Sequence, residues 1–221
     1  HKAIRRQRQM CIRDRSKGYP KKNAQKPSIK IAFLGGLNEI GKNNTLVECE
    51  NDIIIIDCGM AFPDGDMLGV DLVIPDFTYI EQNADRVKGI ILTHGHEDHI
   101  GGLPFLLSKV NVPIYGTPLT LGLVGNKLKE HSLYNQSQLN VINAGQSIKL
   151  GCMKIDFIHV NHSIPDAVAF AIHTPGGTIV HTGDFKIDCT PITGDMIDLS
   201  SFARVGDEGV LALPVSYTHL R

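Results

Sequence analysis

Residues 89–102 read GIILTHGHEDHIGG and place three histidines and two acidic residues directly after a short apolar run. The apolar run is typical of a buried β-strand, and Gly101 and Gly102 allow the backbone to turn and pack closely behind it. His94 and His96 are two residues apart, so at the end of a strand their imidazoles project to the same side. A chain with this segment must bury a strand and gather polar side chains at one end of it.

The crowded donors predict a metal site. Neutral imidazole and carboxylate groups are ligands that suit zinc or manganese. A single histidine at such a position is more often a hydrogen-bonded core residue. Three histidines with interposed acids would instead repel one another and lose hydration with nothing to offset the loss, unless they shared an ion.

One loop cannot supply all the ligands of two ions, and two later strand ends also carry donors. His162 follows an expected strand at 153–159, and Asp184 follows an expected strand at 178–182. Alone, His162 would be an ordinary surface histidine and Asp184 a turn residue. Combined with the first loop, they complete a candidate ligand set drawn from three turns: His94, His96, Asp98, His99, His162 and Asp184.

Composition limits the class of protein. The chain has 221 residues, 42% of them hydrophobic, which suffices for one large domain. No apolar run is long enough to cross a bilayer, and the polar, basic N-terminus is unlike a secretory signal. The five cysteines are odd in number and lack C-x-x-C spacing, which predicts reduced thiols in a cytoplasmic protein.

Charge is distributed unevenly along the chain. Residues 1–28 hold ten Lys or Arg and one acid, whereas residues 29–221 hold 12 basic and 22 acidic residues. A basic tail of this kind can bind nucleic acid, and a solvated, disordered tail is the alternative. Residues 1–15 and 214–221 match no pattern, and we expect them to be foreign to the natural domain, which would cover residues 29–213.

From residue 29 onward, short apolar runs alternate with turns rich in glycine or proline. Early strands come in adjacent pairs and later ones alternate with helices, which favours a layered mixed α/β fold over a simple parallel sheet. The pattern predicts strands at 29–34, 45–49, 53–57, 89–93, 139–143, 153–159, 167–173, 178–182 and 209–213, and helices at 77–84, 100–109, 118–131 and 195–204.

The segment His94-Gly95-His96-Glu97-Asp98-His99 resembles the H-x-H-x-D-H motif of the metallo-β-lactamase superfamily. Four further blocks resemble the ribonuclease J family, which belongs to the β-CASP group of RNA-processing nucleases: 35–43 (GGLNEIGKN), 57–63 (DCGMAFP), 69–76 (GVDLVIPD) and 161–166 (NHSIPD). The resemblance runs from about Ile29 to Leu213. It implies an αββα sandwich, here incomplete, in which two mixed sheets lie face to face, helices cover them and metals bind at one edge.

The resemblance also implies roles for individual residues. His94, His96 and His162 would hold a first zinc ion, and Asp98 and His99 a second, with Asp184 bridging the two; Mn²⁺ is an alternative metal. Asp98 and Asp184 would thereby hold the catalytic water between the ions. Asp57 would orient the ligand loop from behind.

A structural calcium ion is a further implication of the resemblance. In some relatives such an ion is held by backbone carbonyls, and the matching positions here are Leu68 and Val70.

The function implied by the resemblance is hydrolysis of RNA phosphodiesters, by endonuclease and 5′-to-3′ exonuclease action, in RNA maturation and decay. The resemblance places a β-CASP domain, a last histidine ligand and a leaving-group histidine beyond Arg221. We therefore expect the chain alone to bind one zinc ion tightly and a second weakly, and to cleave little RNA.

Two other functions remain open. One is a small-molecule metallohydrolase of the same fold, and the other is a non-catalytic scaffold subunit of a ribonuclease J complex. The presence of all six candidate ligands favours an active parent protein over the scaffold. The expected partners are RNA and either a second copy of the protein or a ribonuclease J paralogue, in the cytoplasm and without membrane contact.

Overall fold

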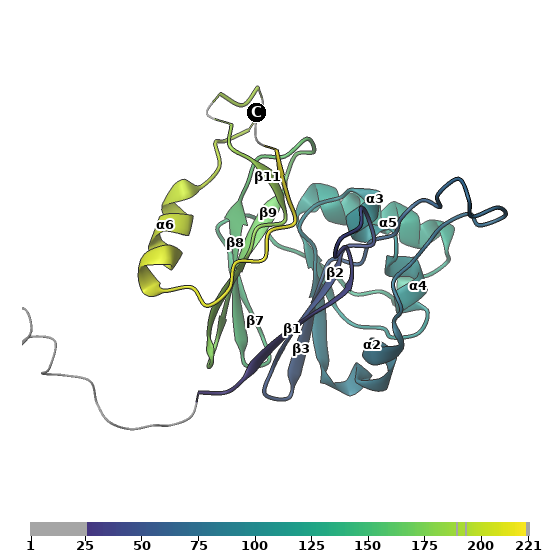
Figure 1. Cartoon of the computed structure of the whole chain (residues 1–221), viewed down its shortest axis with the longest axis horizontal. Helices are drawn as coiled ribbons and strands as arrows, with labels where there is room; N and C mark the ends of the chain where they lie inside the picture. Colours follow the sequence, from purple (N-terminus) through teal and green to yellow (C-terminus); the bar gives the residue numbers. More distant parts are fainter. Residues whose placement is uncertain (1–25, 189, 193, 220–221) are drawn as a thin grey trace, which may run out of the picture.

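The computed structural model describes residues 26–188, 190–192 and 194–219 (Figure 1). Most of the basic tail, together with Cys11 and Cys189, lies outside these residues. Within the described part of the chain, no helix is both long and apolar enough to cross a membrane.

A six-stranded sheet forms the first inner layer, in the order β1-β2-β3-β4-β5-β6. Strands β1 to β3 pair antiparallel, whereas β3 to β6 pair parallel. The strands are β1 (Ile29–Gly35), β2 (Asn44–Cys49), β3 (Asp52–Ile56), β4 (Val87–Ile91), β5 (Ile114–Gly116) and β6 (Leu139–Val141).

A four-stranded antiparallel sheet forms the second inner layer, in the order β10-β9-β8-β7. A short parallel pair, β11 with β12, lies next to it in Figure 1. The strands are β7 (Ser147–Leu150), β8 (Met153–His159), β9 (Val168–Thr174), β10 (Gly177–His181), β11 (Asp184–Lys186) and β12 (Tyr217–His219).

Helices cover the outer faces of both sheets. Figure 1 shows α2 to α5 on the side of the six-stranded sheet and α6 on the side of the four-stranded sheet. The helices are α2 (Thr78–Gln82), α3 (Glu97–Ile100), α4 (Leu103–Leu107), α5 (Pro118–Glu130) and α6 (Leu199–Glu208), with short 3₁₀ turns η1 (Ala84–Arg86) and η2 (Tyr134–Gln136).

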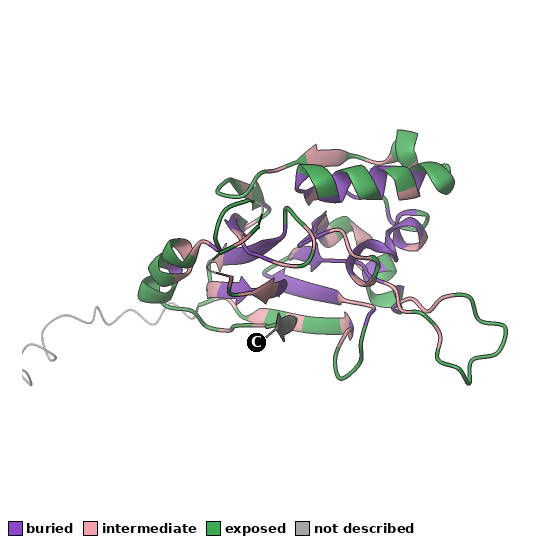
Figure 2. Ribbon diagram, turned by 90° about the horizontal axis from the view of Figure 1, so that it is seen from above, coloured by how far each residue is buried: buried purple, intermediate pink, exposed green. Residues whose placement is uncertain are grey.

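The four layers enclose three apolar interfaces, and β3 shows how the sequence builds them. Ile53 and Ile55 pack with residues of the α2–α5 side, whereas Ile54 and Ile56 pack with residues of β8 and β9. Alternate side chains of a strand point to opposite faces, so a continuous run of isoleucine is what a strand buried on both faces requires. Figure 2 shows this buried centre beneath exposed outer helix faces.

The predicted αββα sandwich is confirmed, but several element boundaries differ. Strands β5, β7, β11 and β12 were not predicted, since three or four residues give a weak periodic pattern, whereas the equally short β6 lies within the strand expected at 139–143. The expected helix at 100–109 is the shorter α4, a separate helix α3 that was not predicted precedes it, and α6 begins at Leu199 and not at 195. The segment 209–213 joins β10 through a single bridge, Ala212 to Ile179, and Pro214 then supplies no N–H to extend the ladder.

A buried carboxylate on β2 links the first sheet to the helical layer. Glu48 accepts hydrogen bonds from Lys30 Nζ and Tyr79 Oη, each at 2.8 Å, and lies 3.2 Å from Arg86 Nη2. These three donors come from β1, α2 and η1. The Lys30 ammonium, together with Tyr79 and Arg86, outweighs the opposing effect of burial and lowers the pKa of Glu48 from 4.5 to about 2.

Glu48→Gln should lower the free energy of unfolding by about 1–2 kcal/mol near neutral pH, because it removes charge-assisted hydrogen bonds. The folded-state pKa lies below the ordinary value, so this contribution is complete above pH 4.5 and is lost as the pH falls toward 2. Denaturant unfolding of both proteins across this range measures the difference. The exposed Glu130→Gln serves as the control, and a gap that stayed constant down to pH 2 would contradict the assignment.

Candidate metal centre

The candidate ligands meet because strand ends from both sheets reach the same edge of the sandwich. The parallel strands β3 and β4 end together, which brings Asp57 beside the segment that starts at Thr93. From the second sheet, His162 follows β8, and Asp184 opens β11 after β10. Residues more than 60 positions apart in the sequence thus share one site.

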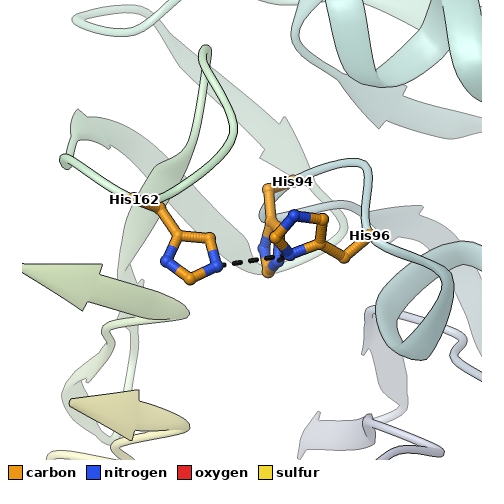
Figure 3. Close-up of side chains that lie close together, drawn as sticks. All are labelled: His94, His96 and His162. Carbon is orange, nitrogen blue, oxygen red and sulfur yellow. Dashed lines mark hydrogen bonds between the residues drawn. The ribbon is translucent and has the colours of Figure 1, made fainter. Parts of the chain in front are cut away.

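Three imidazole nitrogens converge at this edge. His96 Nδ1 lies 3.0 Å from His94 Nε2 and 3.3 Å from His162 Nε2. Figure 3 shows the three rings turned toward one another, two from the loop after β4 and one from the loop after β8. Zinc–nitrogen bonds of about 2.0–2.1 Å in a tetrahedral site separate ligand atoms by roughly 3.3 Å. The observed spacing therefore fits a single divalent ion.

The protonation of these imidazoles also favours metal binding. Burial, reinforced by the charge of His99, lowers the pKa of His94 to about 2. Burial likewise lowers the pKa of His162. Both rings are thus neutral near pH 7, which is the form that coordinates a metal.

A second donor group lies beside the first and contains His94, His99 and Asp184. Asp184 Oδ1 lies 3.5 Å from His99 Nε2, and Asp184 Oδ2 lies 3.7 Å from His162 Nε2. The carboxylate thus stands between the two groups, as a bridging ligand must. Among the described residues, the buried Oδ1 of Asp184 has no hydrogen-bond partner, and a cation would satisfy this orphaned atom.

Asp98 is less enclosed than the other predicted ligands. Its side chain is 37% exposed, and its Oδ2 lies 3.6 Å from His99 Nε2. Asp98 belongs to neither of the two compact donor groups, and His94 joins His99 and Asp184 in its place. Asp98 lines the cleft beside His99. Its assignment to a second ion stays a prediction.

Asp57 anchors the ligand loop from behind. Its carboxylate accepts hydrogen bonds from Thr93 N at 2.8 Å and from Thr93 Oγ1 and His99 Nδ1 at 2.7 Å each. With Nδ1 held in this way, Nε2 of His99 faces the cleft, the arrangement typical of a metal-binding histidine. These contacts fit an orienting role for Asp57 toward bound metal, which stays a prediction.

Charge couples His99 to the neighbouring carboxylates. Burial opposes ionisation of His99, but Asp57 and Asp184 outweigh it and raise its pKa to about 10. Burial would raise the pKa of Asp184, yet His99 keeps it well below its usual range. Asp184 is therefore an anion, and an ion bound at His99 Nε2 must displace a proton.

Two glycines allow close packing around the ligand loop, one against backbone and one against a side chain. A Cβ on Gly59 would lie 1.6 Å from the carbonyl oxygen of Asp98, so no other residue fits there. A Cβ on Gly95 would lie 2.5 Å from a methyl of Leu123. The first loop is thus pressed against β3 on one side and α5 on the other.

Four of the six candidate ligands line a cleft of about 290 Å³, namely His96, Asp98, His162 and Asp184, whereas His94 and His99 are buried behind them. The walls of the cleft are the loop after β1, the two histidine loops and the start of β11: Gly36, Glu39, Ile40, Gly41, Asn43, His96, Asp98, His162, Ser163, Asp184 and Ser216. Neutral imidazoles with carboxylates suit Zn²⁺ or Mn²⁺, so the described residues fit a divalent metal centre.

Three other histidines among the described residues lie outside both donor groups. His173 contacts Asp156 at 3.0 Å, His159 contacts the carbonyl of Asp195 at 3.1 Å, and His181 accepts from Gly183 N at 3.1 Å. These contacts account for them as structural residues.

The calcium prediction concerns the long loop between β3 and α2, which projects from the body of the protein in Figure 1. Leu68 is 91% and Val70 43% exposed there. Backbone carbonyls leave no side-chain signal, so the calcium site stays a prediction.

Sequence reasoning missed two polar residues at the centre. Thr93 Oγ1 lies 3.0 Å from His94 Nδ1 as well as donating to Asp57, and Asn43 contacts both Asp98 and His99. Thr93 lies in the segment 89–102 but was given no role, and Asn43 ends the block 35–43, which was used only for its resemblance to a family. No spacing rule connects Asn43 to a loop 55 residues away.

Comparison of the sequence and the fold with known proteins assigns the chain to a family. The sequence profile of the metallo-β-lactamase superfamily matches residues 37–210. The chain belongs to the metallo-β-lactamase superfamily. The fold agrees: the metallo-β-lactamase fold protein YhfI of Bacillus subtilis superposes with a TM-score of 0.52 at 18% identity, covering 89% of this chain and 88% of YhfI.

Within the superfamily, the chain is similar to proteins named ribonuclease J. It is 50% identical to ribonuclease J 1 of Streptococcus pyogenes serotype M3, over 84% of this chain and 33% of the relative. It is 45% identical to ribonuclease J of Synechocystis sp., over 87% of this chain and 30% of the relative. The chain therefore spans about a third of the length of these curated relatives.

Asp57→Asn should weaken metal binding roughly 10–100-fold, because the amide cannot accept from Thr93 and His99 together as the carboxylate does. Asparagine tolerates the left-handed backbone of this position, where φ is 59°, so the fold should survive. Competition with a chromophoric chelator measures the affinity, and the exposed Asp85→Asn is the control. Unchanged affinity in a folded Asp57→Asn protein would refute this role.

Proposed function

We propose that the chain is the metal-binding part of a zinc-dependent ribonuclease that hydrolyses RNA phosphodiesters. The observation that carries this proposal is the convergence of His94, His96 and His162 at the edge of the sandwich, where His96 and His162 line a cleft, in a chain that is 45–50% identical to ribonuclease J proteins over most of its length. The proposal includes two zinc ions, with Mn²⁺ as an alternative.

The residues of the cleft support phosphodiester hydrolysis in distinct ways. The neutral imidazoles of His94 and His162 are ready to coordinate without losing a proton. Asp184 stands between the two groups as an anion and would hold both ions at a fixed separation. Two divalent ions at such a site lower the pKa of water and neutralise charge on a phosphoryl oxygen.

Charge gives a second reason why an ion is needed. Residues 29–221 carry 22 acidic and 12 basic residues, a balance that repels a polyanion. Affinity for an RNA backbone normally comes from several lysine or arginine contacts. Cations in the cleft would make the reaction site locally positive although the surrounding domain is acidic.

The proposal extends to the wider biology implied by the relatives. It comprises endonuclease and 5′-to-3′ exonuclease action in RNA maturation and decay, a cytoplasmic location, and assembly with a second copy or a paralogue. A small-molecule hydrolase of the same fold is the second candidate, since the metal motif alone does not distinguish substrates. The extended similarity outside that motif favours RNA.

A chimera separates these candidates. In ribonuclease J 1 of Streptococcus pyogenes, the third that matches this chain would be replaced by residues 29–213. We expect the chimera to degrade 5′-phosphorylated RNA with added Zn²⁺ or Mn²⁺, to lose at least roughly 100-fold in rate on His162→Ala, and not to hydrolyse nitrocefin or a thioester. A folded, metal-loaded chimera that cleaves nitrocefin or a thioester but not RNA would overturn the proposal, and one that cleaves neither would favour a scaffold.

The two ions should bind to the 221-residue chain with different strengths. Three imidazoles serve the first position, whereas the second has one imidazole and one partly exposed carboxylate of its own and shares Asp184, so the first Zn²⁺ should bind more than roughly tenfold tighter. Zinc titration against a fluorescent competitor measures both events. His162→Ala should abolish the tight event and His173→Ala should not; equal affinities for two ions would contradict the assignment.

A further inference from the structure

The backbone of Asn43 is fixed between the two segments that build the metal centre. Its N–H donates to the carbonyl oxygen of Asp98 at 3.0 Å, and its own carbonyl accepts from Gly59 N at 2.9 Å. Asn43 therefore joins the loop after β1 to the end of β3 and to α3. These bonds leave its side chain lying along the wall of the cleft.

The amide of Asn43 holds Asp98 from a second direction. Nδ2 donates to the carbonyl oxygen of Asp98 at 3.1 Å and to its carboxylate Oδ2 at 3.3 Å. Both partners are acceptors, so the nitrogen end of the amide faces Asp98. Together with the backbone bond, three hydrogen bonds from one residue converge on Asp98, whose partly exposed carboxylate is otherwise close only to His99 among the contacts of the described residues.

The same amide nitrogen lies 3.1 Å from His99 Nε2. This is the nitrogen that faces the cleft, since Asp57 holds Nδ1. An amide N–H cannot coordinate a cation, so Asn43 acts on the ligands and is not one of them. Its position touches the second donor group and none of the three imidazoles of the first.

We propose that Asn43 is the positioning residue of the second metal position, and that it acts by fixing the Asp98 carboxylate beside His99 Nε2. The inference rests on the proposed two-metal function and assigns a task to the glycine-rich block that precedes β2. Without the amide, the Asp98 side chain is free to turn toward solvent. The first position, built from His94, His96 and His162, does not depend on this contact.

Cobalt titration of the 221-residue chain tests the proposal, because the absorption of bound Co²⁺ reports each binding event without any activity assay. Asn43→Ala should weaken the second Co²⁺ by roughly 10–100-fold and leave the first within about twofold, as loss of a ligand-orienting partner does. Asn111→Ala is the control. The side chain of Asn111 also donates to a backbone carbonyl distant in the sequence, that of Gln136, but at an exposed position. Asn43→Ser keeps a hydroxyl donor, should show a smaller loss, and replaces the alanine variant if the latter fails to fold.

A double-mutant cycle shows whether Asn43 acts through Asp98. In an Asp98→Ala background, Asn43→Ala should have no further effect on the second Co²⁺. Additive losses, equal weakening of both ions, or an unchanged second ion would each overturn the inference. Failure of the unmodified chain to bind any Co²⁺ would instead refute the metal centre itself, and the inference with it.

Discussion

The carboxylate of Asp57 is the contact on which the metal centre depends. It follows β3 in a left-handed backbone conformation and accepts three hydrogen bonds, two from Thr93 and one from His99. These bonds tie the ends of the two central parallel strands together and fix which nitrogen of His99 enters the cleft. A buried carboxylate is stable only with such donors, so the loop that carries the ligands and the core that supports it stabilise each other.

The layered core determines where this contact lies. Ile54 and Ile56 fill the space between the sheets, and Ile53 and Ile55 fill the space under the helices, so β3 cannot slip without exposing one set. With the strand register fixed in this way, the residues after β3, β4, β8 and β10 arrive at one edge. His94 and His162 lie there at an energetic penalty that their neutral form reduces and that a shared cation would offset.

The electrostatics of the domain and of its centre are opposed. Residues 29–221 hold more acidic than basic residues, yet the cleft carries donors that suit divalent cations, so in the proposed ribonuclease the attraction of a phosphodiester would come from the bound ions. In the proposed ribonuclease, the residues that hold the ligands in place, such as Asp57 and Asn43, would control how much positive charge the cleft contains. Metal loading and substrate binding would then be linked through the same few hydrogen bonds.

The sequence by itself determined the layered α/β fold and the ligand types. An uninterrupted isoleucine run requires a strand buried on both faces, and the crowded donors of residues 94–99 have little use other than an ion. The sequence did not predict the short strands β5 and β11, because three residues give too weak a hydrophobic pattern to identify a strand.

Only the tertiary structure decided which donors meet. It put His94 in both donor groups, left Asp98 at the rim, and brought Asn43 and Thr93 into the centre. Their roles arise from the packing of loops distant in the sequence, such as the close approach of Gly59 to the backbone of Asp98. A local sequence pattern shows which side chains follow a strand. The distances between the ends of different strands depend on how the two sheets pack.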